Sequence, residues 1–324
     1  MPFSVKNREW LILKMKRNID IDCFRAVLIS LVILVHVVNF GNLYPLLKNS
    51  ILAFIMPAFL VITGYLVDVD KPLKKFSLYL LRIFLPYLIM VLSYSILSLY
   101  LPVRDGIEVF NVSTITYVLF VKSIGPYWFL HTMMVCGILY YISFRLYSEK
   151  LSVTARYSIF ASLLIIVSLF TPILNIRSAT YYFIGVGIRL YFKDFSCVYI
   201  KNFWPIVPFV LLLSNSYFHD WGAISIVVCV ISFFSFVSKA CSFLSNKSTG
   251  MLEYIGRNTL PIYIFHPIFT MLAKFTLPVF AFEPTGILHA FSVILVGIPG
   301  CICIAKFMDI TRLSYVFFRN RILR

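Results

Sequence analysis

The sequence predicts an all-α membrane protein with about ten transmembrane helices and both termini in the cytoplasm. Of its 324 residues, 60% are apolar and only 13% are charged, and the mean hydropathy is +0.91. Soluble domains carry about 25% charged residues, and a soluble fold of this size could not cover its surface with so few charges. The spacing of the apolar windows and the distribution of the basic residues complete the prediction.

A helix that spans a bilayer needs about 20 mainly apolar residues. Ten windows meet or approach this requirement, and the sixth is the shortest and contains two glycines. A further apolar stretch, 114–121, fits either a half-helix or an interfacial segment. The ten windows are 24–40, 51–67, 83–103, 123–144, 157–176, 178–192, 202–219, 221–238, 258–273 and 284–305.

The basic residues orient these windows. The chain holds 29 Lys and Arg against 13 Asp and Glu, and the basic residues stand in short tracts between the windows. With the N-terminus in the cytoplasm, 22 of them lie inside, five lie outside, and Arg25 and Arg82 fall within the membrane. We therefore expect contacts with anionic membrane lipids and no nucleic-acid partner. One membrane domain, 19–312, is expected between basic cytoplasmic tails at 1–18 and 313–324.

The first window carries the clearest candidate site. Arg25 lies near its cytoplasmic end, His36 follows eleven residues later, and Asp22 precedes Arg25 by three. Eleven residues are close to three helical turns and rise about 16 Å, so both side chains share one face and His36 lies near mid-membrane. A cation at the inner mouth with a titratable base beyond it favours a functional site. The alternative is that Arg25 reaches lipid phosphates and His36 bonds a neighbouring helix.

Other polar residues within the windows are fewer. Arg82 precedes Pro86 by four residues, and a second arginine at the inner side would suit phosphate, although it could equally reach lipid headgroups. His131 and His266 are each more typical of helix packing than of catalysis. No cluster has metal-ligand spacing, so no metal site is expected. The seven cysteines are interpreted as small apolar side chains.

Five motifs, in order along residues 20–313, resemble those of the acyltransferase 3 family of integral membrane acyltransferases. Leu78 and Tyr79 depart from the family, many of whose members carry further arginines at these places before the proline. A second departure is that no acidic residue follows Trp128 closely. The motifs are Asp22 and Arg25 followed by His36; Met56-Pro57 with Thr63-Gly64-Tyr65; Arg82 before Pro86; Trp128; and Asn258 with Tyr263, His266 and Pro267.

The resemblance implies a stand-alone O-acyltransferase, without an appended extracytoplasmic hydrolase-like domain, in the cytoplasmic (inner) membrane of a bacterium. Acyl-CoA, expected to be acetyl-CoA, is the co-substrate rather than a permanently bound cofactor. The acceptor is a hydroxyl of a surface or lipid-linked glycan. His36 is the expected general base, although a relay through an acyl-histidine stays open. Arg25 and Arg82 are expected to hold the CoA phosphates, with Asp22, Trp128, His131, Tyr263 and His266 in support.

Two alternatives compete with this interpretation. Transporters, including flippases of lipid-linked sugars, also place charged residues at mid-membrane, often in discontinuous helices and internal repeats. A purely structural subunit would need neither Arg25 nor His36 to be ionisable. The sequence contains no recognisable internal repeat and few polar residues for a hydrophilic path, which favours the enzyme.

Overall fold

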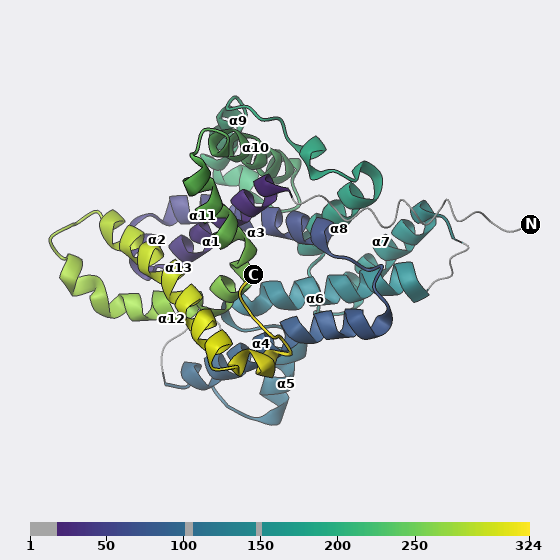
Figure 1. The fold of residues 1–324 in the computed structure, drawn as a ribbon, viewed down its shortest axis with the longest axis horizontal. Coiled ribbons are helices and arrows are strands. Elements are labelled where there is room, and N and C mark those ends of the chain that lie inside the picture. Colours follow the sequence, from purple (N-terminus) through teal and green to yellow (C-terminus); the bar gives the residue numbers. More distant parts are fainter. Residues whose placement is uncertain (1–17, 101–105, 147–150) are drawn as a thin grey trace, which may run out of the picture.

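The computed structural model describes residues 18–100, 106–146 and 151–324, which contain helices and no strands. The predicted tail at 1–18 therefore lies almost wholly outside the described residues. Figure 1 shows an assembly of helices in which α12 and α13 run side by side, and in which the C-terminal end returns toward the middle of the molecule. The predicted all-α class is confirmed.

Each of the ten apolar windows contains a helix, although several bounds differ from the prediction. Part of the third window, 101–103, lies outside the described residues. The helices are α1 (Ile19–His36), α3 (Pro45–Leu66), α4 (Leu73–Ser98), α6 (Trp128–Tyr141), α7 (Val153–Phe170), α8 (Ile176–Gly187), α9 (Ile206–Leu213), α10 (Ile224–Cys241), α12 (Thr259–Thr276) and α13 (Ile287–Ile310).

Seven helices in the described part of the chain are long and apolar enough to cross a bilayer. They are α3, α4, α6 with its flanking turns, α7, α10, α12 with the turn after it, and α13. The remaining three windows fall short for identifiable reasons. α1 carries Asp20, Asp22 and Arg25 in its first two turns, and α8 and α9 are short, with 12 and 8 residues. The chain is thus a multi-helix membrane protein, and the count of ten spans stays a prediction.

α1 occupies the centre of this assembly. Cys23, Phe24, Leu28, Ile29 and Ile33 have no exposed surface, because α3, α10, α11, α12 and α13 all pack against the helix. By contrast, only 11% of the apolar window of α7 is buried, against 61% for α3 and α10. α7 therefore presents most of its surface to lipid, whereas the polar residues of α1 face protein.

Two glycines allow α3 and α8 to approach closely. A Cβ on Gly64 would lie 2.2 Å from the carbonyl oxygen of Tyr182, and a Cβ on Gly185 would lie 2.1 Å from that of Val61. Small residues at such contacts are the usual means by which membrane helices pack backbone against backbone. Beside this contact, Arg189 pairs with Asp68 at 3.7 Å, so the ends of these two helices also meet.

Several helices lie wholly or partly outside the predicted windows. α5 (Val112–Phe120) confirms a helix in the ambiguous stretch 114–121. α2 (Val38–Leu43) is a separate short helix where the first window was expected to continue. α11 (Asn246–Arg257) lies between the predicted windows 221–238 and 258–273, and it packs along α1. A short 3₁₀ helix, η8 (Leu313–Phe317), follows α13.

We predict that Gly185→Ala lowers the free energy of unfolding by about 1–3 kcal/mol, because the added methyl group forces α3 and α8 apart. Thermal unfolding in detergent micelles measures the effect as a lower Tm. Gly250→Ala is the control, since nothing lies within 4 Å of its added Cβ and alanine favours the α11 helix by up to about 1 kcal/mol. Equal Tm values for Gly185→Ala and the unaltered protein would contradict the close contact.

Candidate active site

His36 is the last residue of α1. Val37 leaves the helix in an extended conformation (φ −72°, ψ 108°), and α2 begins at the next residue. The prediction of one continuous helix over 24–40 is therefore wrong beyond His36. The side chain is half-buried, and its Nδ1 lies 2.7 Å from the carbonyl oxygen of Val32. A carbonyl only accepts, so in the neutral ring Nδ1 carries the proton and Nε2 carries the lone pair.

A second imidazole lies against His36. The rings of His36 and His266 are 5.1 Å apart between centroids and nearly perpendicular, at 79°. His266 is fully buried in α12. Its Nδ1 lies 2.7 Å from the carbonyl oxygen of Tyr263, while its Nε2 has no hydrogen-bond partner among the described residues. The predicted candidates His36 and His266 thus belong to one site.

The His266-Pro267 pair explains this arrangement locally. A helical residue at 267 would normally donate its N–H to the carbonyl of Tyr263, but proline has no N–H. The carbonyl that is left unsatisfied accepts instead from Nδ1 of His266 at 2.7 Å. The proline therefore fixes the ring and selects the tautomer in which Nε2 carries the lone pair.

A chain of aromatic contacts extends from this pair to the start of α6. His266 lies 5.7 Å from the Tyr263 ring, which lies 5.6 Å from Phe129, and Trp128 lies 6.3 Å from Phe129. The Tyr263 hydroxyl also donates to the carbonyl of Pro126. Tyr263, predicted as a supporting residue, therefore joins α12 to the start of α6. Trp128, the other predicted supporting residue here, also packs against Trp221 at 6.0 Å.

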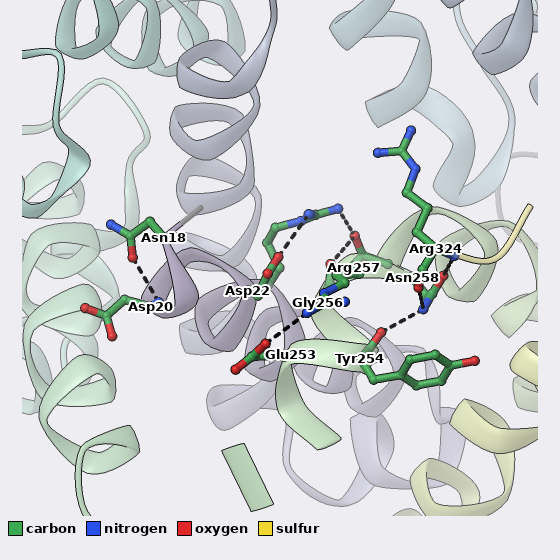
Figure 2. Close-up of polar contacts among 11 residues, drawn as sticks. Asn18, Asp20, Asp22, Glu253, Tyr254, Gly256, Arg257, Asn258 and Arg324 are labelled. Atoms are coloured by element: carbon green, nitrogen blue, oxygen red, sulfur yellow. Dashed lines mark hydrogen bonds and ion pairs between the residues drawn. The ribbon is translucent and has the colours of Figure 1, made fainter. Parts of the chain in front are cut away.

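Arg25 lies near the other end of α1, on the side that faces α12. Its guanidinium is 3.7 Å from the Asp22 carboxylate and donates to the Thr259 hydroxyl, which in turn donates to the carbonyl of Gly256 at 3.3 Å. Figure 2 shows Asp22, Gly256 and their neighbours in this network. Since His36 faces His266 and Arg25 faces Thr259 on the same helix, the predicted common face of Arg25 and His36 agrees with the contacts.

Arg82 lies beside the C-terminal tail. Its Nε donates to the carbonyl of Phe318 at 2.8 Å, and Arg319 donates to the carbonyl of Arg82 at 3.3 Å. A pocket of about 480 Å³ opens here, lined by Arg82, other residues of α4 and the tail. Arg25 does not line this pocket, so the expected pairing of Arg25 and Arg82 is indirect. Arg324 lines the pocket, and its backbone bonds the side chain of Asn258, the residue before Thr259.

His131 contacts other residues than the His36 and His266 pair does. Its Nε2 lies 3.1 Å from the carbonyl oxygen of Phe120, and its ring lies 6.2 Å from that of Tyr87. Tyr87 itself donates to the carbonyl of Leu119 at 2.8 Å. His131 therefore ties α5 to α6, which matches the packing role that was the alternative for a lone membrane histidine.

A small pocket of about 100 Å³ begins at the residue after His36. Its lining includes Val37, Asn39, Asn42, Lys274 and His289, from α1's end, α2, α12 and α13. His289 is almost fully buried and its Nδ1 has no hydrogen-bond partner among the described residues. The two pockets lie at opposite ends of α13, because about 30 Å of helix separates His289 from Asp309, the residue that binds the tail.

Sequence reasoning missed Thr259, Asn258 and the tail arginines as members of the site. Asn258 and Thr259 do belong to one of the family-like motifs, which was the available signal, but their partners on α1 and in the tail depend on the fold. In the described residues no group of three or more His, Cys, Asp or Glu could hold a metal ion.

The apolar helices, the histidine pair and the arginine network together define a polytopic membrane protein with a polar site inside its helix assembly. The model of the acyltransferase 3 family, described as an acyltransferase domain, matches residues 18–306. The chain therefore belongs to this family and is a membrane acyltransferase. No match to the chain is found among curated proteins or solved structures.

We predict that Thr259→Val lowers the free energy of unfolding by about 1.5–3 kcal/mol, because it leaves the Arg25 guanidinium without one acceptor. Thr270→Val is the matched control on the same helix, since the Thr270 hydroxyl bonds a neutral carbonyl at 3.3 Å and its loss costs only about 1 kcal/mol. Thermal unfolding in detergent compares the two variants. A Tm decrease for Thr259→Val no larger than for Thr270→Val would argue against the importance of the Arg25 contact.

Proposed function

We propose that the protein is an O-acyltransferase that moves an acyl group, acetyl in the first instance, from cytoplasmic acyl-CoA to a hydroxyl of a surface or lipid-linked glycan. Its location would be the cytoplasmic membrane of a bacterium, with ten spans and both termini inside. The observation that carries the proposal is the contact of His36 with His266 at the break between α1 and α2, on the helix face that also bears Arg25.

In the proposed reaction, Nε2 of His36 accepts the proton of the acceptor hydroxyl. The hydroxyl oxygen attacks the thioester carbonyl, the carbon–sulfur bond breaks, and the CoA thiolate leaves with the proton from the imidazolium. The hydrogen bond from Nδ1 to Val32 supports this role, because it leaves the lone pair on Nε2. The route through an acyl-histidine uses the same nitrogen as nucleophile, so both routes require His36.

His266 is a positioning residue in this mechanism. Its ring packs at 5.1 Å against His36 and is fixed by the Tyr263 carbonyl. A buried ring held in one orientation restricts the His36 ring to one direction, which keeps the reacting nitrogen in place before the substrates arrive. The chain of rings through Tyr263 and Phe129 supports that orientation from α6.

The two pockets fit substrates of different character. The pocket beside Arg82 is strongly basic and suits the phosphates of acyl-CoA. The smaller pocket beside Val37 offers the amides of Asn39 and Asn42 and the ammonium group of Lys274, groups that can bond the hydroxyls of a glycan. Because these pockets lie at opposite ends of α13, the donor and the acceptor would reach His36 from opposite sides of the membrane.

The competing function, transport of a lipid-linked sugar, makes a different prediction about CoA. A carrier would consume no thioester, whereas an acyltransferase releases one CoA for each acyl group transferred. Labelled acetyl-CoA supplied to the purified protein, reconstituted in lipid extracted from the producing cells, distinguishes the two. Release of CoA with transfer of label to a lipid or glycan fraction supports the enzyme, and the absence of both refutes it.

We predict that His36→Gln decreases acyl transfer by about 10²–10⁴-fold, the usual contribution of a general base, without loss of membrane insertion. His219→Gln is the control, because His219 is half-buried and bonds only the carbonyl of Leu213 among the described groups. Initial rates of CoA release, measured chromatographically, provide the comparison. Full activity of the His36→Gln protein would refute the mechanism.

We predict that Arg82→Gln raises the KM for acetyl-CoA by about tenfold and leaves kcat nearly unchanged, as expected when uniform binding energy is lost. Lys74→Gln is the control on the same helix, since Lys74 is exposed and does not line the pocket. Steady-state kinetics against acetyl-CoA concentration measure both. An unchanged KM for Arg82→Gln would count against the assignment of the donor phosphates to this pocket.

A further inference from the structure

The C-terminal tail is folded onto the membrane domain by specific bonds to its backbone. The Asp309 carboxylate accepts the N–H groups of Ile322 and Leu323 at 2.7 and 3.1 Å. The side chain of Asn258 accepts the N–H of Arg324 at 2.8 Å and donates to its carbonyl at 3.3 Å, as Figure 2 shows. These bonds fix the course of the tail without using any of its arginine side chains.

The tail supplies half of the cations around the pocket beside Arg82. Apart from its basic residues, the pocket is lined by three uncharged residues, Leu78, Tyr79 and Asn320. Its volume of about 480 Å³ is within the range of small-molecule sites. The basic residues that line it are Lys71, Lys75 and Arg82 from the α4 end and Arg319, Arg321 and Arg324 from the tail.

These cations have little neutralisation from protein groups. Lys71 pairs with Asp68 at 3.7 Å, and between described residues no ion pair joins a carboxylate to Arg82, Arg319, Arg321 or Arg324. The nearby Asp309 carboxylate is occupied by the backbone of the tail. Burial, together with repulsion from Arg324 and Arg82, lowers the pKa of Arg319 to about 10, so the group stays protonated at neutral pH.

We propose that Arg319, Arg321 and Arg324 of the tail, together with Arg82, form the binding site for the phosphate groups of the acyl-CoA donor. Several arginines held close together without carboxylate partners are stabilised by a multiply charged anion, which each guanidinium can bind through two N–H groups. This assignment rests on the proposed function and adds to it residues that lie outside the matched range 18–306.

The proposal also accounts for the departure from the family in α4. Leu78 and Tyr79, which stand where many members have arginines, both line this pocket. The tail brings arginines to the same space from a distant part of the chain. The site thus gains from residues 319–324 the positive charge that α4 does not supply.

The test compares CoA with dephospho-CoA, which lacks the phosphate on the ribose, as ligands of the full-length protein in detergent. The unaltered protein is expected to bind CoA more tightly than dephospho-CoA. The double variant Arg321→Gln/Arg324→Gln is expected to bind CoA about tenfold more weakly and to lose most of this preference. The same variant should raise the KM for acetyl-CoA by a similar factor with kcat nearly unchanged. Lys306→Gln/Arg312→Gln is the control, because it removes equal charge at exposed positions outside the pocket.

A second variant and a measurement of Tm distinguish a loss of CoA binding from a loss of folding. Asp309→Ala retains all the arginines but frees the backbone of the tail, so it should also weaken CoA binding while the Tm of Arg321→Gln/Arg324→Gln stays close to that of the unaltered protein. The proposal is overturned if Arg321→Gln/Arg324→Gln binds CoA and dephospho-CoA as the unaltered protein does. It is also overturned if this variant changes only binding to vesicles of phosphatidylcholine and phosphatidylglycerol, which would assign the pocket to lipid headgroups.

Failure of the proposed function has a separate signature. An unaltered protein that binds CoA with the phosphate preference but never releases CoA from acetyl-CoA would refute the acyltransferase mechanism and leave the phosphate pocket supported. If the unaltered protein turns over acetyl-CoA and the tail substitutions leave the KM for acetyl-CoA unchanged, only the assignment of the tail arginines is refuted.

Discussion

The polar contacts between α1 and α12 are the constraint on which the rest of the site depends. Charged and titratable groups inside a membrane protein are costly unless they are paired or hydrogen-bonded, and α1 places Arg25 and His36 at the centre of the assembly. α12 supplies a partner for each of them: the Thr259 hydroxyl accepts a hydrogen bond from Arg25, and the His266 ring packs against His36. The relative position of these two helices therefore determines the surroundings of both Arg25 and His36.

The surrounding helices fix the position of α1 relative to α12. Gly256 at the end of α11 lies so close to α1 that a Cβ would be 2.0 Å from the carbonyl of Asp22, which fixes the start of α12 against Arg25. Further along α12, the Tyr263 hydroxyl donates a hydrogen bond to the carbonyl of Pro126, and the Tyr263 ring packs against Phe129. Thr259, Tyr263 and His266, which all belong to one family-like motif segment, thus take part in or support this one contact.

Much of this arrangement could be predicted from local sequence. Apolar windows identify helices because a helix in lipid must be apolar over its length, and the eleven-residue spacing of Arg25 and His36 places both on one face by geometry alone. The end of α1 at His36 could not be predicted, because neither glycine nor proline marks Val37. The partnership of Arg25 with Thr259 spans 234 residues, and no local pattern carries information about such a contact.

The tail and α11 escaped prediction for a related reason. Both segments are polar, so hydropathy assigns them to the loops, yet each is fixed by particular side chains of the membrane helices. α11 has its close approach at Gly256, and the tail has the Asp309 carboxylate, whose pairing with the N–H groups of Ile322 and Leu323 is invisible in composition. The sequence of the tail suggests only an orientation signal, because the tail carries a net positive charge. In the fold, its arginines line the pocket beside Arg82.

The separation between the basic pocket and His36 follows from the energetics of the membrane. A phosphate group carried to mid-membrane would lose its hydration at a cost of several kcal/mol or more, so the charged part of the proposed acyl-CoA donor would be held where water and arginines meet. In the proposed reaction, the uncharged arm that bears the thioester would cover the distance from Arg25 to His36, about 16 Å along α1. In that proposed reaction, fixed cations at one end of α1 and only neutral polar groups beyond them would allow the reacting carbonyl, and not the phosphates, to reach the imidazole.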